Sequence, residues 1–381
     1  MARVSVILPV RNGGPHLAMA LASLLGQTHR DLRVIAIDDG SVDGSADLIR
    51  AAADRDPRVL PVVRENRGLV STLNEGLSLA DSDLVARMDA DDIAFPDRIA
   101  RQVAAFDEAD DLGLLGTGFV TIYGPTRVTP AARPTLTGAG ERAVLGRFCT
   151  CLRHPTVMFR RSRIAAHALH YDPRYPHAED FDLFRRLAQV TRLAELPEPL
   201  LAYRLHPASV SATQMAVMCD THLRILEENL ARHYPSASGT GAVSLARHPD
   251  RASVDAAAMM VRRLQSLLPA QPAAERAAFR TGLVTTVHFV FALLCRLRAY
   301  PLAHRFIAGA GCHTLIRRRE RAVLSSPFAH AGMTVSEWEV ALRRSLSSRS
   351  LPDSVPGFAA ISRQATVIAA SVPRLRSDHA A

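Results

Sequence analysis

The sequence predicts an α/β fold in which a mostly parallel sheet is flanked by helices and followed by a mainly α-helical C-terminal region. Short apolar, β-branched runs alternate with segments of helical periodicity, which is typical of βαβ units. The runs are continuously apolar, as expected for strands buried on both faces. Beyond residue 213 the apolar spacing is helical throughout. With 48% hydrophobic residues in 381, the chain can bury sizeable cores and is not globally disordered.

The predicted elements of the N-terminal half follow one another in strict alternation. Strands are expected over residues 4–10, 32–37, 59–63 and 84–88. Helices are expected over residues 16–25, 45–53, 68–80 and 96–106. The third helix illustrates the pattern, because Leu69, Leu73 and Leu77 recur every four residues and form one apolar stripe.

A second block completes the chain. Residues 126–140 are rich in Thr, Pro, Gly and Ala and are predicted to form a loop or short linker. Extended segments are expected at 151–159 and 193–204, and helices at 179–188, 219–234, 253–268 and 273–297. Ser, Arg and Pro are frequent from Ser347 onward, which predicts a poorly ordered tail. The predicted parts are therefore 1–212, 213–346 and 347–381.

Charge divides the chain at the same place. The net charge is +9, and all 46 basic residues are arginines. Residues 1–212 hold 25 arginines and 26 acids, whereas residues 213–381 hold 21 arginines and 11 acids, a net of +10. A basic surface attracts anionic lipid or acidic substrates, or it is simply solvated. Only 5% of residues are aromatic, so nucleic-acid binding is not expected.

One apolar run in the basic region allows two interpretations. Leu283 to Cys295 is shorter than the roughly 20 residues that span a bilayer, and Arg296, Arg298 and Arg305 follow it. A further arginine cluster lies at 317–321. Such a helix can lie at an anionic membrane surface, or it can be a core helix or pair two chains in a homodimer.

Five cysteines, an odd number, argue against a disulfide scaffold and favour a reducing compartment. The first ten residues pass directly into a predicted strand without a secretory signal pattern. The expected location is the cytoplasm, with peripheral attachment to the inner face of the plasma membrane if the basic region binds lipid.

Polar residues follow three of the predicted strands. They are Asn12-Gly13, Asp38-Asp39 and Asp89-x-Asp91. Carboxyl ends of parallel strands share one sheet edge, so these groups are expected in one crevice. Close carboxylates repel unless a cation lies between them, and oxygen ligands suit Mg²⁺ or Mn²⁺ with substrate phosphates. The alternative is a set of helix caps and Asx-turns.

Other signatures are missing or incomplete. No G-x-x-x-x-G-K-[ST] and no G-x-S-x-G occurs, which argues against a P-loop enzyme and an α/β-hydrolase. Gly113, Gly116 and Gly118 do not fit G-x-G-x-x-G. Cys149-x-Cys151 with His154 lacks the usual spacing of a zinc site.

The motifs VSVILPVRNGG, VIAIDDGSVDGS and DLVARMDADD, in this order, resemble the N-terminal half of family-2 glycosyltransferases of GT-A fold. His154-Pro155, the segment 178–183 and the segment 203–211 match the same family further on. The resemblance covers residues 3–212. It implies inverting transfer of a sugar from a nucleotide-diphosphate sugar, UDP-sugar being favoured, to a hydroxyl of a glycan or lipid-linked acceptor in polysaccharide or glycolipid synthesis.

The resemblance also assigns roles to individual residues. Nucleotide-sugar binding falls on Pro9, Arg11, Asn12, Asp39, Asn66, Gly68, Asp89 and Arg204. Binding of Mn²⁺ or Mg²⁺ falls on Asp89, Asp91 and His206.

The general base falls on Asp180, with Glu179 preceding it. Acids are also common at helix N-termini, which is the structural alternative for this pair. The alternative function is a non-catalytic membrane-surface or scaffold protein that retains the fold.

Overall fold

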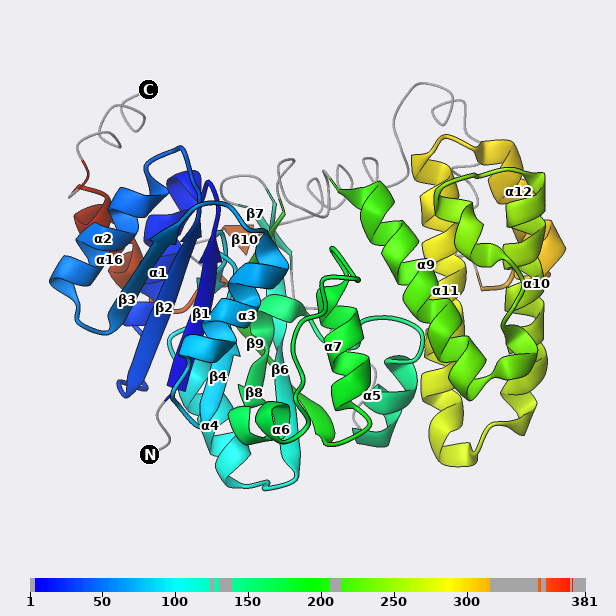
Figure 1. Ribbon diagram of the computed structural model, residues 1–381, viewed down its shortest axis with the longest axis horizontal. Coiled ribbons are helices and arrows are strands. Elements are labelled where there is room, and N and C mark those ends of the chain that lie inside the picture. The colour runs from blue at the N-terminus through cyan, green and yellow to red at the C-terminus, as the bar shows by residue number, and fades with distance from the viewer. Residues whose placement is uncertain are drawn as a thin grey trace.

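The computed structural model describes residues 4–123, 127–129, 139–205, 214–315, 349–350, 354–370 and 372. A ten-stranded sheet carries helices on both faces, and a group of helices follows it in sequence and lies to one side (Figure 1). The predicted fold class is confirmed. The boundary at residue 212 stays a prediction, because residues 206–213 are not among those described.

The elements of the N-terminal half agree with the predicted alternation. The strands are β1 (Val4–Val10), β2 (Leu32–Asp39), β3 (Val59–Arg64), β4 (Leu84–Arg87), β5 (Ile93–Ala94), β6 (Leu112–Tyr123), β7 (Arg127–Thr129), β8 (Met158–Arg160) and β9 (Arg192–Leu205). The helices are α1 (Leu17–Leu25), α2 (Ser45–Arg55), α3 (Leu69–Leu79), α4 (Arg98–Asp107), α5 (Ala139–Leu145), α6 (Arg161–Ala166) and α7 (Glu179–Leu187).

The sheet is mixed, which corrects the expectation of a mostly parallel one. Strands β4, β1, β2 and β3 are parallel neighbours, as βαβ units require. On the other side of β4, strand β8 runs antiparallel, and it pairs antiparallel with β6. The chain enters β8 from a short 3-10 helix, His154–Thr156, and not from the crossover helix of a βαβ unit, so the strand need not run parallel. Strand β9 lies parallel to β6 and also pairs with β5.

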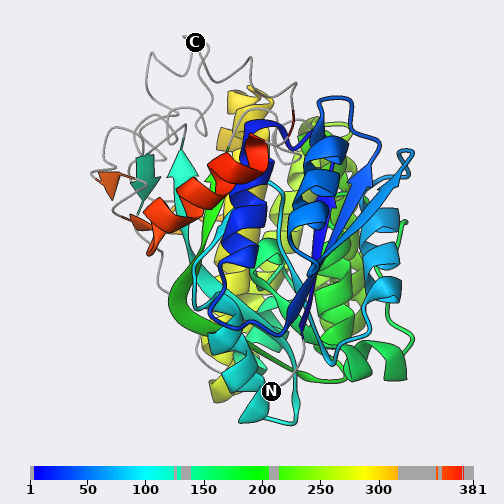
Figure 2. The ribbon, with the colours of Figure 1, turned by 90° about the vertical axis from the view of Figure 1, so that its left-hand side faces the viewer.

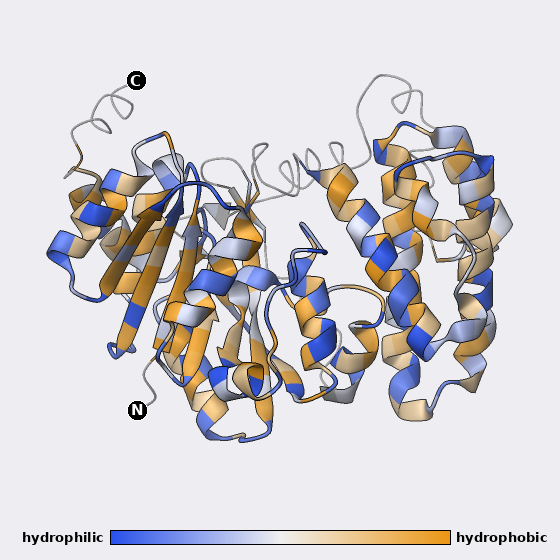
Figure 3. Cartoon of the chain, in the orientation of Figure 1, coloured by the Kyte–Doolittle hydropathy of each residue, from blue (hydrophilic) through white to orange (hydrophobic). Residues whose placement is uncertain are grey.

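Alternate residues of β1 belong to different cores. Val4, Val6, Leu8 and Val10 face α1, α2 and α4, while Ile7 faces α3 and the β8 region. Both faces are apolar, which explains the continuous run in the sequence and the hydrophobic strands in Figure 3.

Strand β6 is absent from the strands predicted from the sequence, because its glycines lower the strand propensity of the segment. The glycines are needed for close packing: a Cβ on Gly118 would meet the carbonyl oxygens of Pro197 and Glu198 at 2.8 Å. Residues 126–140 also differ from the predicted loop, since β7 and the start of α5 fall within them. The remainder, 130–138, lies outside the described residues.

The C-terminal region contains α9 (Met215–His233), α10 (Arg251–Leu267), α11 (Ala273–Arg296) and α12 (Tyr300–Ala310). By length and composition α11 could cross a membrane. Its apolar residues Leu283, Val287 and Leu294 are nonetheless buried in a core shared with the other three helices. The packing therefore favours the core-helix interpretation of the apolar run. Arg305 pairs with Asp255 of α10, and the arginines at 317–321 lie outside the described residues.

The C-terminal tail contains an ordered helix, contrary to the expected poor order of residues 347–381. A short strand, β10 (Arg349–Ser350), pairs with β7, and α16 (Phe358–Ala369) lies beside α1 (Figure 2). Ile361, Ala365 and Ile368 recur at helical spacing and are buried in the core that contains α1. The helical spacing of these apolar residues allows the segment to fold against α1, although the composition of the tail as a whole is polar.

We predict that Ile361→Ala lowers the free energy of unfolding by about 2–3 kcal/mol, because it removes a buried side chain and leaves a cavity. Urea titration followed by circular dichroism measures this change. Val367→Ala on the same helix is the control, since that side chain is 52% exposed and its loss should cost less than about 0.5 kcal/mol. Equal stability of both variants would show that α16 does not stabilise the domain.

Candidate active site

Asp39, at the end of β2, connects two of the loops that the sequence analysis expected at one crevice. Its Oδ1 accepts from the amide of Arg67 at 2.7 Å, and its Oδ2 accepts from the amide of Gly68 at 3.0 Å. The Arg64 guanidinium forms an ion pair with the same carboxylate. The loop after β3 is thereby held against the end of β2.

The two loops approach each other closely at Gly40. A Cβ on Gly40, whose φ is +76°, would lie 2.7 Å from the amide nitrogen of Asn66. Only glycine fits both this backbone conformation and this distance. The structure therefore brings Asp39, Asn66 and Gly68 together, as predicted.

The loop after β1 joins the same group. Arg11 donates from Nη1 to the carbonyl of Asp39 at 3.4 Å. Asn12 has φ +51°, accepts from the amide of Val42 through Oδ1 at 2.9 Å, and donates its own amide to Ser41 Oγ. Pro9 is buried within β1. These contacts assemble the predicted donor-binding residues, and their roles toward a nucleotide stay predictions.

A second cluster lies beside β1, in the loop that follows β4. Carboxylate oxygens of Asp89, Asp91 and Asp92 lie within 4.8 Å of one another. The Met88 amide donates to the Ile7 carbonyl, so this loop leaves the sheet next to the end of β1. Sequence reasoning named Asp89 and Asp91 but not Asp92, although Asp92 belongs to the same D-A-D-D run.

Burial and mutual repulsion perturb two acids of this cluster. Burial, followed by the charges of Asp91 and Asp89, holds the pKa of Asp92 well above its usual range. Burial likewise raises the pKa of Asp89, and an ion pair with Arg87 opposes that rise. Asp92 Oδ2 is buried and has no hydrogen-bond partner among the described residues. Three close oxygen ligands with one unpaired acceptor fit a hard divalent cation.

Arg204, near the end of β9, ties this acidic loop to the sheet. Its amide donates to Asp92 Oδ1 at 2.8 Å, and its Nε donates to the Asp91 carbonyl at 2.9 Å. The side chain is buried. The structure thus places Arg204 at the predicted site. His206, the third predicted metal ligand, lies outside the described residues.

The predicted base and its neighbour occupy different environments at the N-terminus of α7. Asp180 is half-buried; its Oδ1 accepts from the Phe181 amide at 2.7 Å, and its Oδ2 accepts from Thr150 Oγ1 at 3.3 Å. Glu179 is buried, and its Oε2 has no hydrogen-bond partner among the described residues. Burial, followed by the charge of Asp180, raises the pKa of Glu179 to about 7. Only Asp180 is therefore placed to touch a substrate.

Three buried residues that were not predicted as site residues connect the two clusters. Tyr171 OH lies 2.9 Å from His154 Nε2, and His154 Nδ1 lies 4.0 Å from Glu179 Oε1. Arg87 pairs with Asp89. Burial lowers the pKa of His154 and the charge of Arg87 adds to this effect, whereas the same charge opposes the rise that burial causes in the pKa of Glu179. Little in the sequence indicated Tyr171 or Arg87, because a tyrosine in a loop and an arginine in a strand usually have structural roles. His154 does not take part in the zinc alternative, since its Nε2 is engaged by Tyr171.

The base and the acidic loop lie within electrostatic reach of each other. The charges of Asp180 and Asp91 both act to raise the pKa of Asp89. The site therefore combines an acidic loop, a half-buried carboxylate and a group of polar loops at one edge of the sheet. Such an arrangement can stabilise a leaving diphosphate and accept a proton from an attacking hydroxyl.

We predict that Glu179→Gln changes the pH dependence of stability. The folded state of the wild type holds the Glu179 proton up to a pKa of about 7, whereas the unfolded chain loses it near about 4.3. Because the folded state binds more protons in that window, wild-type stability falls as pH rises from about 4.3 to 7.

The glutamine variant lacks this loss, so in the presence of EDTA it should gain stability relative to the wild type as pH rises from 5 to 8. Urea unfolding at each pH measures the difference. Glu108→Gln, at an exposed position, is the control for the loss of one carboxylate. A constant difference between Glu179→Gln and wild type would contradict the raised pKa.

Comparisons with known proteins agree with this geometry. Residues 5–166 match the family model described as Glycosyl transferase family 2. An uncharacterized glycosyltransferase of Haemophilus influenzae is 29% identical over 237 residues, which cover 60% of this chain and 73% of that protein. The succinoglycan biosynthesis protein ExoU of Rhizobium meliloti is 32% identical over 197 residues, 48% of this chain and 56% of ExoU.

Among solved structures, S. aureus TarS 1–349 in complex with UDP is similar at a TM-score of 0.48 and 16% identity, covering 86% of this chain and 92% of TarS 1–349. The family-model match includes the ends of β1, β2, β3 and β4 and the loops after them, which carry the predicted donor and metal residues other than Arg204 and His206. Residues 5–166 therefore match glycosyl transferase family 2, and the chain is similar to glycosyltransferases.

Proposed function

We propose that this enzyme transfers a sugar from a nucleotide-diphosphate sugar, preferably a UDP-sugar, to an acceptor hydroxyl with inversion at the anomeric carbon. The observation that carries the proposal is the half-buried Asp180 within electrostatic reach of the acidic loop 89–92. One accessible carboxylate serves a single displacement, in which the acceptor hydroxyl loses its proton to Asp180 as it attacks.

The remaining residues prepare that step. The loops fixed by Asp39 offer backbone and side-chain groups to the base and ribose of the donor. Asp89, Asp91 and Asp92 would hold Mn²⁺ or Mg²⁺, which when bound would neutralise charge on the leaving diphosphate. Arg204 fixes the acidic loop through its amide and Nε, and Thr150 orients Asp180.

The acceptor class is proposed from chemistry and from the relatives. ExoU is named for succinoglycan biosynthesis, which supports a glycan or lipid-linked glycan as acceptor. A cytoplasmic location, with contact to the inner face of the membrane, suits such an acceptor. The adjacent acids at the site favour an enzyme over the non-catalytic scaffold alternative, because a scaffold has no need of buried carboxylate oxygens, such as Asp92 Oδ2 and Glu179 Oε2, that lack a hydrogen-bond partner among the described residues.

A donor screen tests the proposal. Release of nucleoside diphosphate from UDP-, dTDP- and GDP-sugars, measured with a panel of glycoside acceptors, should identify one preferred donor. NMR of the product should show an inverted anomeric configuration. Release from no donor would exclude the proposed function, and retained configuration would exclude the single displacement.

We predict that Asp180→Asn folds normally and loses turnover by roughly 10²–10⁴-fold, which is the usual contribution of a positioned general base. Steady-state kcat with the preferred donor measures the loss. Asp255→Asn is the matched control, because Asp255 pairs with Arg305 on the helical region and lies outside the site. A kcat near the wild-type value in Asp180→Asn would remove this residue from the base role.

Chelation should abolish activity, and added Mn²⁺ or Mg²⁺ should restore it, since three carboxylates in close contact need a cation to bind an anionic donor. Asp91→Asn should remain impaired after the metal is returned. Calorimetric titration of UDP with and without Mn²⁺ provides a second measure. Full turnover in excess EDTA would show that no divalent ion takes part.

A further inference from the structure

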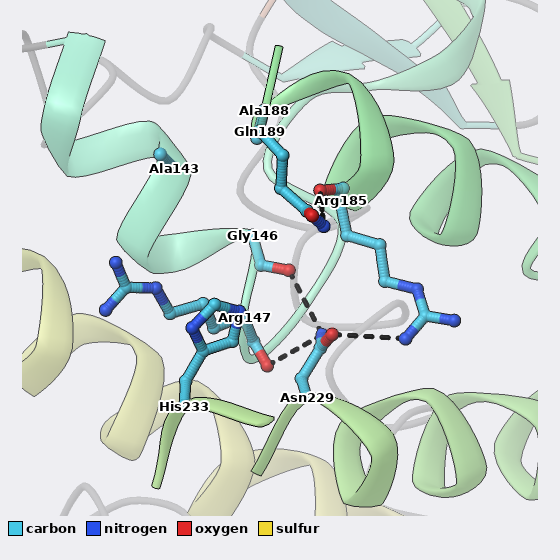
Figure 4. A pocket seen from close by; sticks show the side chains of 8 residues that line it. All are labelled: Ala143, Gly146, Arg147, Arg185, Ala188, Gln189, Asn229 and His233. Atoms are coloured by element: carbon cyan, nitrogen blue, oxygen red, sulfur yellow. Dashed lines mark hydrogen bonds between the residues drawn. The ribbon is translucent and has the colours of Figure 1, made fainter. Parts of the chain in front are cut away.

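The C-terminal helix α9 is bound to α7, the helix that carries the proposed base. Arg185 of α7 donates from Nη1 to Asn229 Oδ1 at 3.1 Å, and Asn229 Nδ2 donates to the Arg147 carbonyl at 3.0 Å. Figure 4 shows these bonds around a small pocket at the joint. The buried Asn229 side chain thus joins α7, α9 and the segment after α5.

Further contacts along the same helices fix their alignment. Ile225 of α9 packs in a small buried cluster with Phe181 and Tyr175. Tyr175 OH donates to Glu228 Oε2 at 2.9 Å, and Arg185 pairs with the same carboxylate. Polar and apolar contacts together hold α9 in one position along α7.

This alignment brings His222 against Phe181 and within electrostatic reach of the proposed base, Asp180. His222 precedes Ile225 by three residues, so both project from the same side of α9. The centroid of its ring lies 5.4 Å from that of Phe181, the residue that directly follows Asp180. Its ring also stacks with Phe289 of α11 at 5.7 Å. Two aromatic neighbours on two helices restrict the orientation of the imidazole.

The hydrogen bond of His222 fixes its tautomer. Nδ1 lies 3.0 Å from the Met218 carbonyl, which can only accept, so Nδ1 carries the proton. Burial, the larger effect, lowers the pKa of His222, and the charge of Asp180 opposes it. The ring is therefore neutral at pH 7, and its Nε2 is an acceptor. Nε2 forms no hydrogen bond with any residue in the described part of the chain.

We propose that His222 belongs to the acceptor site and that its Nε2 accepts a hydrogen bond from a hydroxyl of the acceptor sugar, next to the hydroxyl activated by Asp180. The proposal rests on the proposed transferase function and deepens it. It specifies an acceptor with at least two neighbouring hydroxyl groups. It also gives the helical region a direct part in substrate binding.

An NMR titration tests the location of His222 without any substrate. The imidazole signal of His222 is assigned by its loss in His222→Phe. In full-length Asp180→Asn the pKa of His222 should fall below its wild-type value, because the negative charge that raises it is gone. An unchanged pKa would place His222 away from the base and overturn the proposal.

Kinetics test the hydrogen bond. With the preferred donor and p-nitrophenyl β-glycosides as acceptor probes, His222→Phe should raise the acceptor KM about 10-fold, as expected for one lost hydrogen bond. The donor KM and the slow hydrolysis of donor without acceptor should stay within about twofold of wild type. His222→Gln should recover part of the loss, because its amide oxygen can accept.

His233→Phe, near the end of α9, is the matched control and should leave all three quantities unchanged. An unchanged acceptor KM in His222→Phe, or an equal rise in donor KM, would overturn the role of His222 in the acceptor site. A wild-type enzyme that turns over no donor would instead refute the proposed function. In that case the NMR titration, which needs no substrate, would still test whether His222 lies near Asp180.

Discussion

Repulsion among the carboxylates of Asp89, Asp91 and Asp92 is the constraint on which the site depends. The fold holds them within 4.8 Å of one another, partly out of water, at the edge of a sheet. Arg87 pairs with one of them, and Arg204 fixes the loop through its backbone and Nε. Burial and the neighbouring carboxylates still hold the pKa of Asp92 well above its usual range. A loop of this kind is stable and functional chiefly when a cation and an anionic ligand complete it.

The charge of the acidic loop also acts on Glu179, at the start of α7. Burial and neighbouring carboxylates keep Glu179 a weak acid, while Asp180, beside it, stays accessible and oriented by Thr150. His154 and Tyr171 fill the space behind Glu179 and hold it in a dry environment. Two adjacent acids in α7 thus differ in exposure, which fits the proposed division between Asp180 as the base and Glu179 as a buried neighbour.

The helical C-terminal region connects to this site through apolar and polar contacts between α9 and α7, and not through its excess of arginines. Several of its basic residues pair locally, such as Arg247 with Asp220 and Arg305 with Asp255, and surface pairs of this kind contribute little to stability. Its apolar helix α11 forms the core of the region and supports α9. Helix α9 in turn contacts α7, so the arrangement of these helices decides what lies opposite Asp180.

The sequence by itself determined the alternation of strands and helices, the three polar loops at one sheet edge and the acids at 89–91 and 179–180. These features are local, since each follows from a run of a few residues and its apolar spacing. Tertiary structure alone decided the mixed order around β8, the glycine-rich strand β6 and the ordered helix α16, because each depends on a partner far away in sequence. It also decided that Asp92 joins the acidic cluster, that Arg87, Tyr171 and His154 lie between the acids, and that His222 approaches Asp180. Burial and proximity assign these roles, and both arise only when distant segments pack together.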